Sequence, residues 1–152
     1  IALIKNKKPV LGVIYVPCQK KTYFAEKNKG AYLLSKDEIA KLPLSKKPKE
    51  KIILVSRSHL SQKTKEFIKK YETEHKINLK TLPMGSSLKF CVIAEGSAHI
   101  YPRLGPTMEW DTAAGDIIVS EAGGKMESIV DKVPLEYNKE DLHNPFFITK
   151  NY

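Results

Sequence analysis

Asp111 lies where an apolar pattern of helical period begins, directly after the only tryptophan of the chain. The apolar residues that follow are spaced as one buried helix face, and Gly123 and Gly124 provide a stop signal. The carboxylate is therefore expected at the N-terminal end of a bounded helix. There it can cap the first turn by accepting amide hydrogens, or it can bind a hard cation such as Mg²⁺ beside a phosphate.

The stretch GSSLKF, residues 85–90, also begins a predicted helix, with Ser86 or Ser87 as its cap and Lys89 in the first turn. A lysine at this end of a helix opposes the helix dipole and costs roughly a few tenths of a kcal/mol unless an anion is nearby. The position of Lys89 therefore indicates an anionic ligand. The spacing Ser-x-x-Lys also occurs in serine acyl-enzymes of the penicillin-binding type, but the chain lacks the Lys-Thr-Gly element that accompanies it there.

Two further motifs carry residues that can bind anions. Arg103 lies in YPRLGPT, a loop bounded by proline and glycine just before the tryptophan. Its guanidinium can pair with Asp111 or can clamp a phosphate. His59 ends the motif SRSH, which follows a predicted buried strand at the place where a parallel sheet presents ligand-binding groups; a surface turn is the alternative interpretation.

The charge and the cysteines limit the class of protein. The net charge is +9, and because only two of the 26 basic residues are arginines, 24 are lysines. Dispersed lysine is typical of a solvated surface, so the charge alone does not indicate a nucleic-acid-binding protein. Cys18 and Cys91 lack any metal-binding spacing, and no apolar run approaches the roughly 20 residues that span a bilayer. We expect reduced thiols and a cytoplasmic location, with peripheral association at the inner membrane left open.

The elements that must position these residues fall into two groups. Residues 1–34 alternate short β-prone runs with turn signals, which predicts a β-meander, and residues 35–51 read as a polar connection. Predicted strands and helices then alternate, which indicates an α/β layer with a mostly parallel sheet. We therefore expect the last strands of an antiparallel sheet and a connection in residues 1–50, and a C-terminal α/β subdomain in residues 51–152.

The long motifs together resemble the inositol monophosphatase superfamily, and within it the 3′(2′),5′-bisphosphate nucleotidase branch. The resemblance is carried by IALI...PVLGVIYVP, SRSH, GSSLKFCVIAEG and YPRLGPTMEWDTAAGDIIVSEAGG, and it covers nearly the whole chain. It implies a layered αβαβα sugar-phosphatase-like fold. It also implies a Mg²⁺-dependent phosphatase that removes the 3′-phosphate of adenosine 3′,5′-bisphosphate, and of its sulfated relative, in sulfur metabolism.

The resemblance assigns roles to individual residues. Asp111, in Trp-Asp-x-Ala-Ala-Gly, becomes a metal ligand, and its role as a cap becomes secondary. His59, Ser86, Lys89 and Arg103, together with Asp111, would contact the substrate. An inositol monophosphatase is the alternative within the superfamily, although that branch tends to carry an acidic residue where this chain has Arg103. A non-catalytic basic module that binds nucleotides or nucleic acid is the alternative from another class.

The chain departs from the family pattern in one respect. The family also uses an upstream glutamate and an Asp-Pro-(Ile/Leu)-Asp-Gly-Thr motif to hold the metals, and this motif does not occur here. The sequence begins with an apolar run without a start signal, as if inside a strand, so we expect the motif directly before Ile1 in the same enzyme. The chain would then need that N-terminal half as its partner, and it is predicted to be inactive alone.

Overall fold

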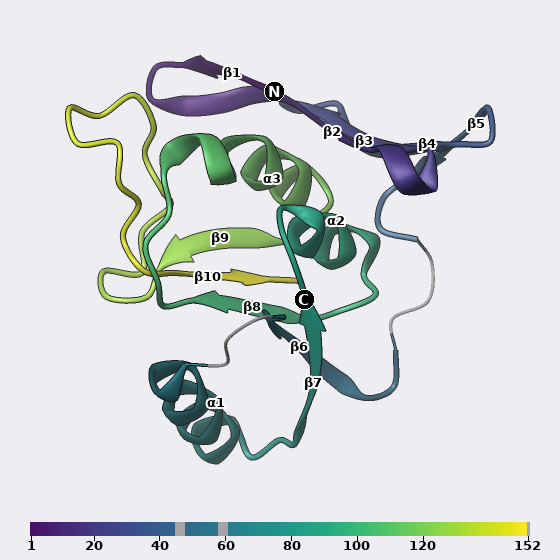
Figure 1. The fold of residues 1–152 in the computed structure, drawn as a ribbon. Coiled ribbons are helices and arrows are strands. Elements are labelled where there is room, and N and C mark those ends of the chain that lie inside the picture. The colour runs from purple at the N-terminus through teal and green to yellow at the C-terminus, as the bar shows by residue number, and fades with distance from the viewer. Residues whose placement is uncertain (45–47, 58–60, 152) are drawn as a thin grey trace.

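The structure is a computed structural model that describes residues 1–44, 48–57 and 61–151. Two five-stranded sheets enclose a pair of helices, and a third helix covers the far face of the second sheet (Figure 1). The α/β fold class predicted from the sequence is confirmed. The helices are α1 (Gln62–His75), α2 (Leu88–Glu95) and α3 (Glu109–Glu121).

The first sheet is an antiparallel meander whose strands pair in chain order, as the sequence predicts. A short 3₁₀ turn, η1 (Pro17–Gln19), joins the second strand to the third. The fifth strand corrects the sequence analysis, which placed residues 35–51 in a polar connection. Lys36 and Asp37 adopt positive φ angles of 50° and 63° and fold the chain back on itself. The strands are β1 (Ala2–Lys5), β2 (Lys8–Val16), β3 (Lys21–Glu26), β4 (Gly30–Ser35) and β5 (Glu38–Lys41).

The second sheet has the order β7-β6-β8-β10-β9. Strand β6 pairs in parallel with β7 and β8, whereas β10 is antiparallel to both of its neighbours. Within this sheet β10 therefore runs opposite to the other four strands, and the expected mostly parallel layer is confirmed. The strands are β6 (Lys51–Ser56), β7 (Leu79–Met84), β8 (Ile100–Arg103), β9 (Lys125–Ser128) and β10 (Phe147–Lys150).

The apolar core joins the layers. One cluster holds Tyr23 and Leu33 of the first sheet, Ile118 of α3 and Phe147 of the second sheet. A smaller cluster seats α1 on the other face of the second sheet, through the three side chains that its periodicity predicts to point inward. The two sheets therefore share one core across α2 and α3, and the division into residues 1–50 and 51–152 stays a prediction about domain organisation. The inward side chains of α1 are Phe67, Ile68 and Tyr71.

Candidate functional site

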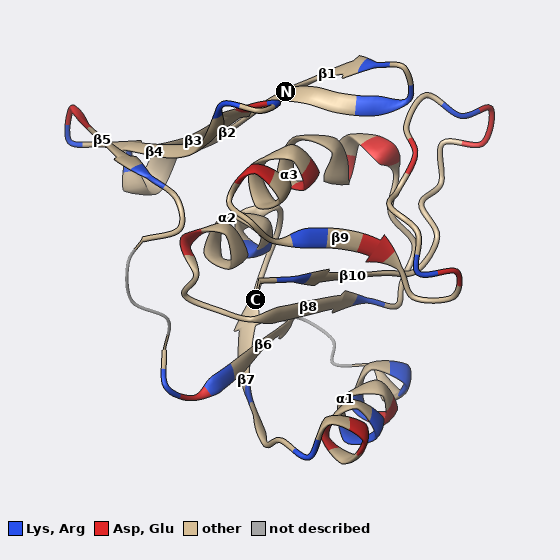
Figure 2. Ribbon diagram, turned by 180° about the vertical axis from the view of Figure 1, so that it is seen from behind, with Lys and Arg blue, Asp and Glu red and all other residues tan. Residues whose placement is uncertain are grey.

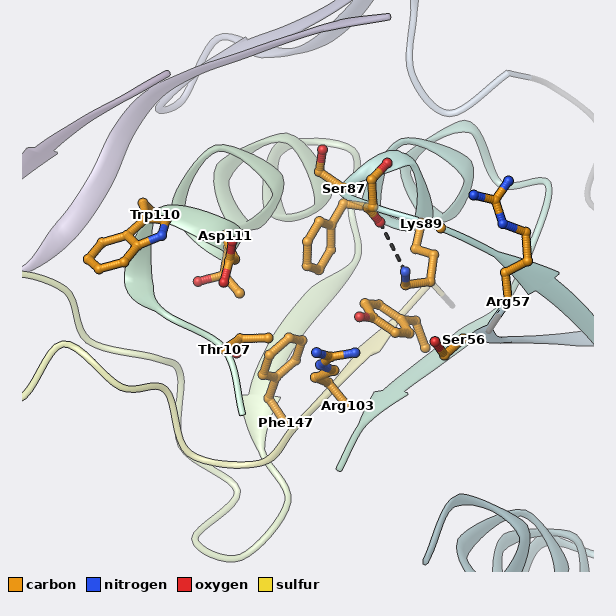
Figure 3. A pocket seen from close by; sticks show the side chains of 14 residues that line it. Ser56, Arg57, Ser87, Lys89, Arg103, Thr107, Trp110, Asp111 and Phe147 are labelled. Atoms are coloured by element: carbon orange, nitrogen blue, oxygen red, sulfur yellow. Dashed lines mark hydrogen bonds between the residues drawn. The ribbon is translucent and has the colours of Figure 1, made fainter. Parts of the chain in front are cut away.

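A pocket of about 550 Å³ opens where β6 and β8 end and where α2 and α3 begin (Figure 3). Ser86, Lys89, Arg103 and Asp111 all line it, so the structure brings together four of the five predicted substrate-binding residues. The fifth, His59, lies outside the described residues. The location agrees with the rule that ligands bind at the carboxyl ends of the strands of an α/β sheet.

Asp111 is the third residue of α3, and the helix begins earlier than the sequence predicts. Met108 is the N-cap, and Asp111 Oδ2 accepts a hydrogen bond from its backbone N–H at 2.9 Å. The apolar pattern located the buried apolar residues from Ala113 onward and missed the first turn, because its buried residue Glu109 is charged and its apolar residue Trp110 is 68% exposed. The Asp111 carboxylate thus caps the helix from its third residue. This corrects the sequence-based assignment of Asp111 as the N-cap residue.

The second oxygen of Asp111 can serve a metal. Within the described part of the chain no hydrogen bond engages Oδ1, and Asp111 is the only acidic residue that lines the pocket. No group of three His, Cys, Asp or Glu side chains gathers among the described residues in a way that could hold a metal ion. Because Mg²⁺ requires about six oxygen ligands, the geometry fits Asp111 as one ligand of a metal that needs further ligands.

Lys89 is buried, with 5% of its surface exposed. Its Nζ donates hydrogen bonds to the carbonyl oxygens of Ser86 at 3.0 Å and Met84 at 3.3 Å, and it lies 5.0 Å from the centre of the Tyr101 ring. Burial, followed by repulsion from Arg103, lowers the pKa of Lys89 to about 8. An ammonium group has three donors, so one remains for a ligand.

Ser86 and Ser87 shape the turn before α2. Ser87 is the N-cap, but its side chain makes no capping hydrogen bond, and Ser86 adopts a left-handed conformation with φ of 51°. The hydroxyl of Ser86 lies 3.5 Å from the amide of Leu88, which is a long contact. The first amides of α2 are therefore only weakly capped, and such a helix start favours an anion.

Arg103 ends β8 beside the pocket. One terminal nitrogen donates to the carbonyl of Pro106 at 3.1 Å, while the buried Nε has no hydrogen-bond partner among the described residues. No ion pair joins Arg103 to Asp111 within the described chain, so that sequence-based alternative is not observed. Because this Nε is enclosed by protein atoms, a ligand in the pocket would be bound by the terminal nitrogens of the guanidinium, one of which also donates to Pro106.

Arg57 also lines the pocket, and the sequence did not indicate it because the family resemblance assigns a role within SRSH to His59 alone. Together with Lys89 and Arg103 it sets three cations against the single carboxylate of Asp111. The other basic residues are spread over turns and strand ends, and on α1 they are mixed with acidic residues (Figure 2). The pocket thus combines three cations with two helix starts at the carboxyl ends of strands β6 and β8, which makes it a candidate anion-binding site in an α/β protein.

The chain belongs to the inositol monophosphatase family, whose family model matches residues 1–148. It is 39% identical to the 3'(2'),5'-bisphosphate nucleotidase CysQ of Shigella flexneri over all of this chain and 59% of that protein. It is 40% identical to the CysQ of Salmonella typhimurium over 97% of this chain and 57% of that protein. The chain thus spans less than two thirds of the length of these relatives. The family is generally metal-dependent.

Solved structures agree with this assignment. The crystal structure of CysQ from Bacteroides thetaiotaomicron has a TM-score of 0.90 and 43% identity, and the match covers 98% of this chain and 60% of that one. Inositol monophosphatase-II from Staphylococcus aureus has a TM-score of 0.72 at 18% identity over 99% of this chain and 53% of that one, which shows the shared fold. No helix among the described residues is long and apolar enough to span a membrane.

Proposed function

We propose that this chain forms the substrate-binding wall of a Mg²⁺-dependent phosphomonoesterase. Its substrate is adenosine 3′,5′-bisphosphate, together with its sulfated relative, from which the enzyme removes the 3′-phosphate in sulfur metabolism. The observation that carries the proposal is the pocket itself, which brings the cationic side chains of Arg103 and Lys89 together with the carboxylate of Asp111 (Figure 3). The names of the CysQ relatives support the same reaction.

The residues of this chain divide the work between binding and metal coordination. Asp111 would provide one oxygen ligand to Mg²⁺, which when bound lowers the pKa of a water and offsets charge on the phosphoryl group. Lys89 and Arg103 would hold the phosphate that is retained, because a guanidinium fork and a buried ammonium both favour phosphate oxygens. The amides and hydroxyls at Ser86 and Ser87 would add donors at the start of α2.

The charge of the pocket favours two alternative functions less than it favours the phosphatase. An inositol monophosphate carries a single phosphate on a polyol, and a pocket with Arg57, Lys89 and Arg103 has more positive charge than such a substrate needs. A non-catalytic module that binds nucleotides or nucleic acid would not need Asp111, whose carboxylate reduces the attraction for phosphate. The phosphatase uses both the cations and the acid.

The proposal also covers the remaining metal ligands and the location of the enzyme. The remaining metal ligands would come from another part of the same enzyme that carries the Asp-Pro-(Ile/Leu)-Asp-Gly-Thr motif, since the motif is absent from these 152 residues. A cytoplasmic location fits the two free thiols of Cys18 and Cys91.

A substrate panel tests the proposal. The complete encoded polypeptide is supplied with Mg²⁺, and phosphate release is measured from adenosine 3′,5′-bisphosphate, adenosine 3′-phosphate and inositol 1-phosphate. We expect the largest kcat/KM for the bisphosphate and no turnover after chelation of the metal. A preference for inositol 1-phosphate would favour the other branch of the family, and nucleotide binding without turnover would favour the binding module.

A further inference from the structure

The buried side chain of Asn144 links the C-terminal part of the chain to the start of α3. Its Nδ2 lies 2.8 Å from the carbonyl oxygen of Met108, 3.1 Å from the hydroxyl of Thr112 and 3.2 Å from that of Thr107. Met108 is the N-cap of α3, Thr107 precedes it and Thr112 follows the first turn. A single amide group therefore contacts both sides of the turn that carries Asp111.

The contacts determine which way the Asn144 amide is turned. A backbone carbonyl can only accept a hydrogen bond, so the atom beside the Met108 oxygen must be the amino group. The hydroxyl of Thr112 donates to the carbonyl of Glu109 at 3.1 Å, so it accepts from Asn144. The amino group is thus fully engaged, whereas the buried Oδ1 has no hydrogen-bond partner among the described residues.

The Asn144 side chain is not needed to hold the two segments together. The backbone N–H of Glu109 donates to the carbonyl of Leu142, and the N–H of Asn144 donates to the carbonyl of Thr107, both at 2.9 Å. The unpaired Oδ1 also reduces what the side chain contributes to stability, since a buried acceptor without a partner is costly. Its distinctive effect is therefore on the orientation of the helix start.

Met108 connects Asn144 to Asp111. The carbonyl oxygen of Met108 accepts from Asn144 and also from the backbone N–H of Asp111 at 3.0 Å. The backbone N–H of Met108 donates to Oδ2 of Asp111 at 2.9 Å. Because a carboxylate is planar, holding Oδ2 on this N–H restricts the direction in which Oδ1 can point.

We propose that Asn144 is a positioning residue, which directs the free oxygen of Asp111 toward the metal by fixing the backbone of Met108. The inference rests on the proposed function, in which Asp111 is a ligand of Mg²⁺. Asn144 does not line the pocket, so it acts through Met108 and not by direct contact with a ligand. Loss of a residue that orients a metal ligand typically costs about 10–100-fold in metal affinity or activity.

The test compares Asn144→Ala with Asn151→Ala in the complete encoded polypeptide. Asn151 is the matched control, because its buried Nδ2 also donates to a backbone carbonyl, that of Ile93 at 2.7 Å, and it lies outside the pocket. Both variants should lower the unfolding temperature by a similar amount. Only Asn144→Ala should raise the Kd for Mg²⁺, by about 10–100-fold in a calorimetric titration with the metal alone.

Steady-state rates with adenosine 3′,5′-bisphosphate provide a second measurement. In Asn144→Ala, kcat at limiting Mg²⁺ should fall together with the metal affinity, whereas KM for the nucleotide should change little, because Lys89 and Arg103 are untouched. Asn151→Ala should leave both constants unchanged. If Asn144→Ala does not fold, Asn144→Asp replaces it, since it keeps the shape of the side chain, lacks the amino group and should show the same loss.

Two results would overturn the positioning role of Asn144. One is a Kd for Mg²⁺ in the folded Asn144 variant equal to that of the wild type, and the other is a rise of the same size in Asn151→Ala. A wild-type enzyme that neither binds Mg²⁺ nor hydrolyses the bisphosphate would be a different result, because it overturns the proposed function together with this inference.

Discussion

At the scale of single residues, Lys89 combines burial with a charge that no carboxylate among the described residues neutralises. Its hydrogen bonds go to two backbone carbonyls, and its pKa is lowered to about 8 by burial and by Arg103. A lysine with a pKa near neutrality is a titratable part of the binding site. Its charge is fully present below that pKa and is lost as the pH rises through it.

We therefore expect kcat/KM for adenosine 3′,5′-bisphosphate to fall as the pH rises through about 8, because kcat/KM reports the free enzyme. Rates measured between about pH 6 and 10 check this. In Lys89→Met the overall rate should be lower and this alkaline decline should be absent, since no ammonium is left to titrate. A decline of the same size in the methionine variant would assign it to another group.

Asp111→Asn separates the two roles of this side chain. The amide oxygen of asparagine can still accept the Met108 N–H, so the start of α3 and the unfolding temperature should change little. A neutral amide binds Mg²⁺ poorly, so turnover of the complete polypeptide should fall by several orders of magnitude. Rates at increasing Mg²⁺ and thermal unfolding check both parts. Near-normal turnover at saturating Mg²⁺ would leave the carboxylate with a structural role alone.

Arg103→Glu tests which phosphate this residue binds. The substitution replaces attraction by repulsion only where a second phosphate is present, so kcat/KM should fall far more for adenosine 3′,5′-bisphosphate than for adenosine 3′-phosphate. The comparison also controls for the hydrogen bond to Pro106, whose loss would affect both substrates. Equal losses on both would show that Arg103 supports the loop and does not recognise the phosphate.

At the scale of elements, the approach of α3 to the first sheet depends on a glycine. A Cβ added to Gly12 of β2 would lie 2.8 Å from the carbonyl oxygen of Ala114 and too close to the side chain of Ile117. The backbone of a helix cannot move aside to relieve such a contact as the end of a flexible side chain can. The helix that carries Asp111 is therefore positioned by the absence of a side chain on the strand beneath it.

Gly12→Ala should lower the free energy of unfolding by about 1–3 kcal/mol, because it overpacks this contact. Urea unfolding of the complete polypeptide measures the change. Gly105→Ala is the matched control, since the nearest atom to its added Cβ is Arg103 Cζ at 4.0 Å. Equal stabilities of the two variants would show that α3 shifts freely on the sheet and that the glycine is not required.

The elements found from the sequence are those with a strong periodic signal. The helix α1 has three inward side chains at helical spacing, and β6 is an apolar run, so local pattern was sufficient for both. The strand β5 was missed because three of its four residues are exposed at the edge of the sheet and give no apolar run. Its pairing with β4 depends on the turn, which a pattern of burial does not report.

The sequence also predicted most of the residues of the candidate site, but not all of them. The motifs located Ser86, Lys89, Arg103 and Asp111, because each lies at the boundary of a strand or helix that the pattern places. The sequence could not show that Arg57 joins them, since its position depends on how β6 lies beside the turn at Gly85. It also could not choose between an ion pair and a free guanidinium for Arg103.

At the scale of the whole molecule, the described chain lines this pocket with more positive than negative charge. Arg57, Lys89 and Arg103 attract an anionic substrate, but Asp111 is the only carboxylate among the described lining residues. Mg²⁺ gives up its water reluctantly, and a single carboxylate cannot compete firmly for it. The described residues therefore supply three cations that can bind substrate but a single carboxylate that can bind the metal.

We accordingly expect residues 1–152, produced by themselves, to release no phosphate from adenosine 3′,5′-bisphosphate above the uncatalysed background, even with abundant Mg²⁺. Without a firmly held metal no water is activated, although the three cations can still bind the nucleotide. Calorimetric titration with the nucleotide and a phosphate-release assay measure the two properties separately, and the complete CysQ of Bacteroides thetaiotaomicron serves as the active control. Metal-dependent turnover by the purified chain, abolished by Asp111→Asn, would show that Asp111 and the described residues suffice to hold the metal.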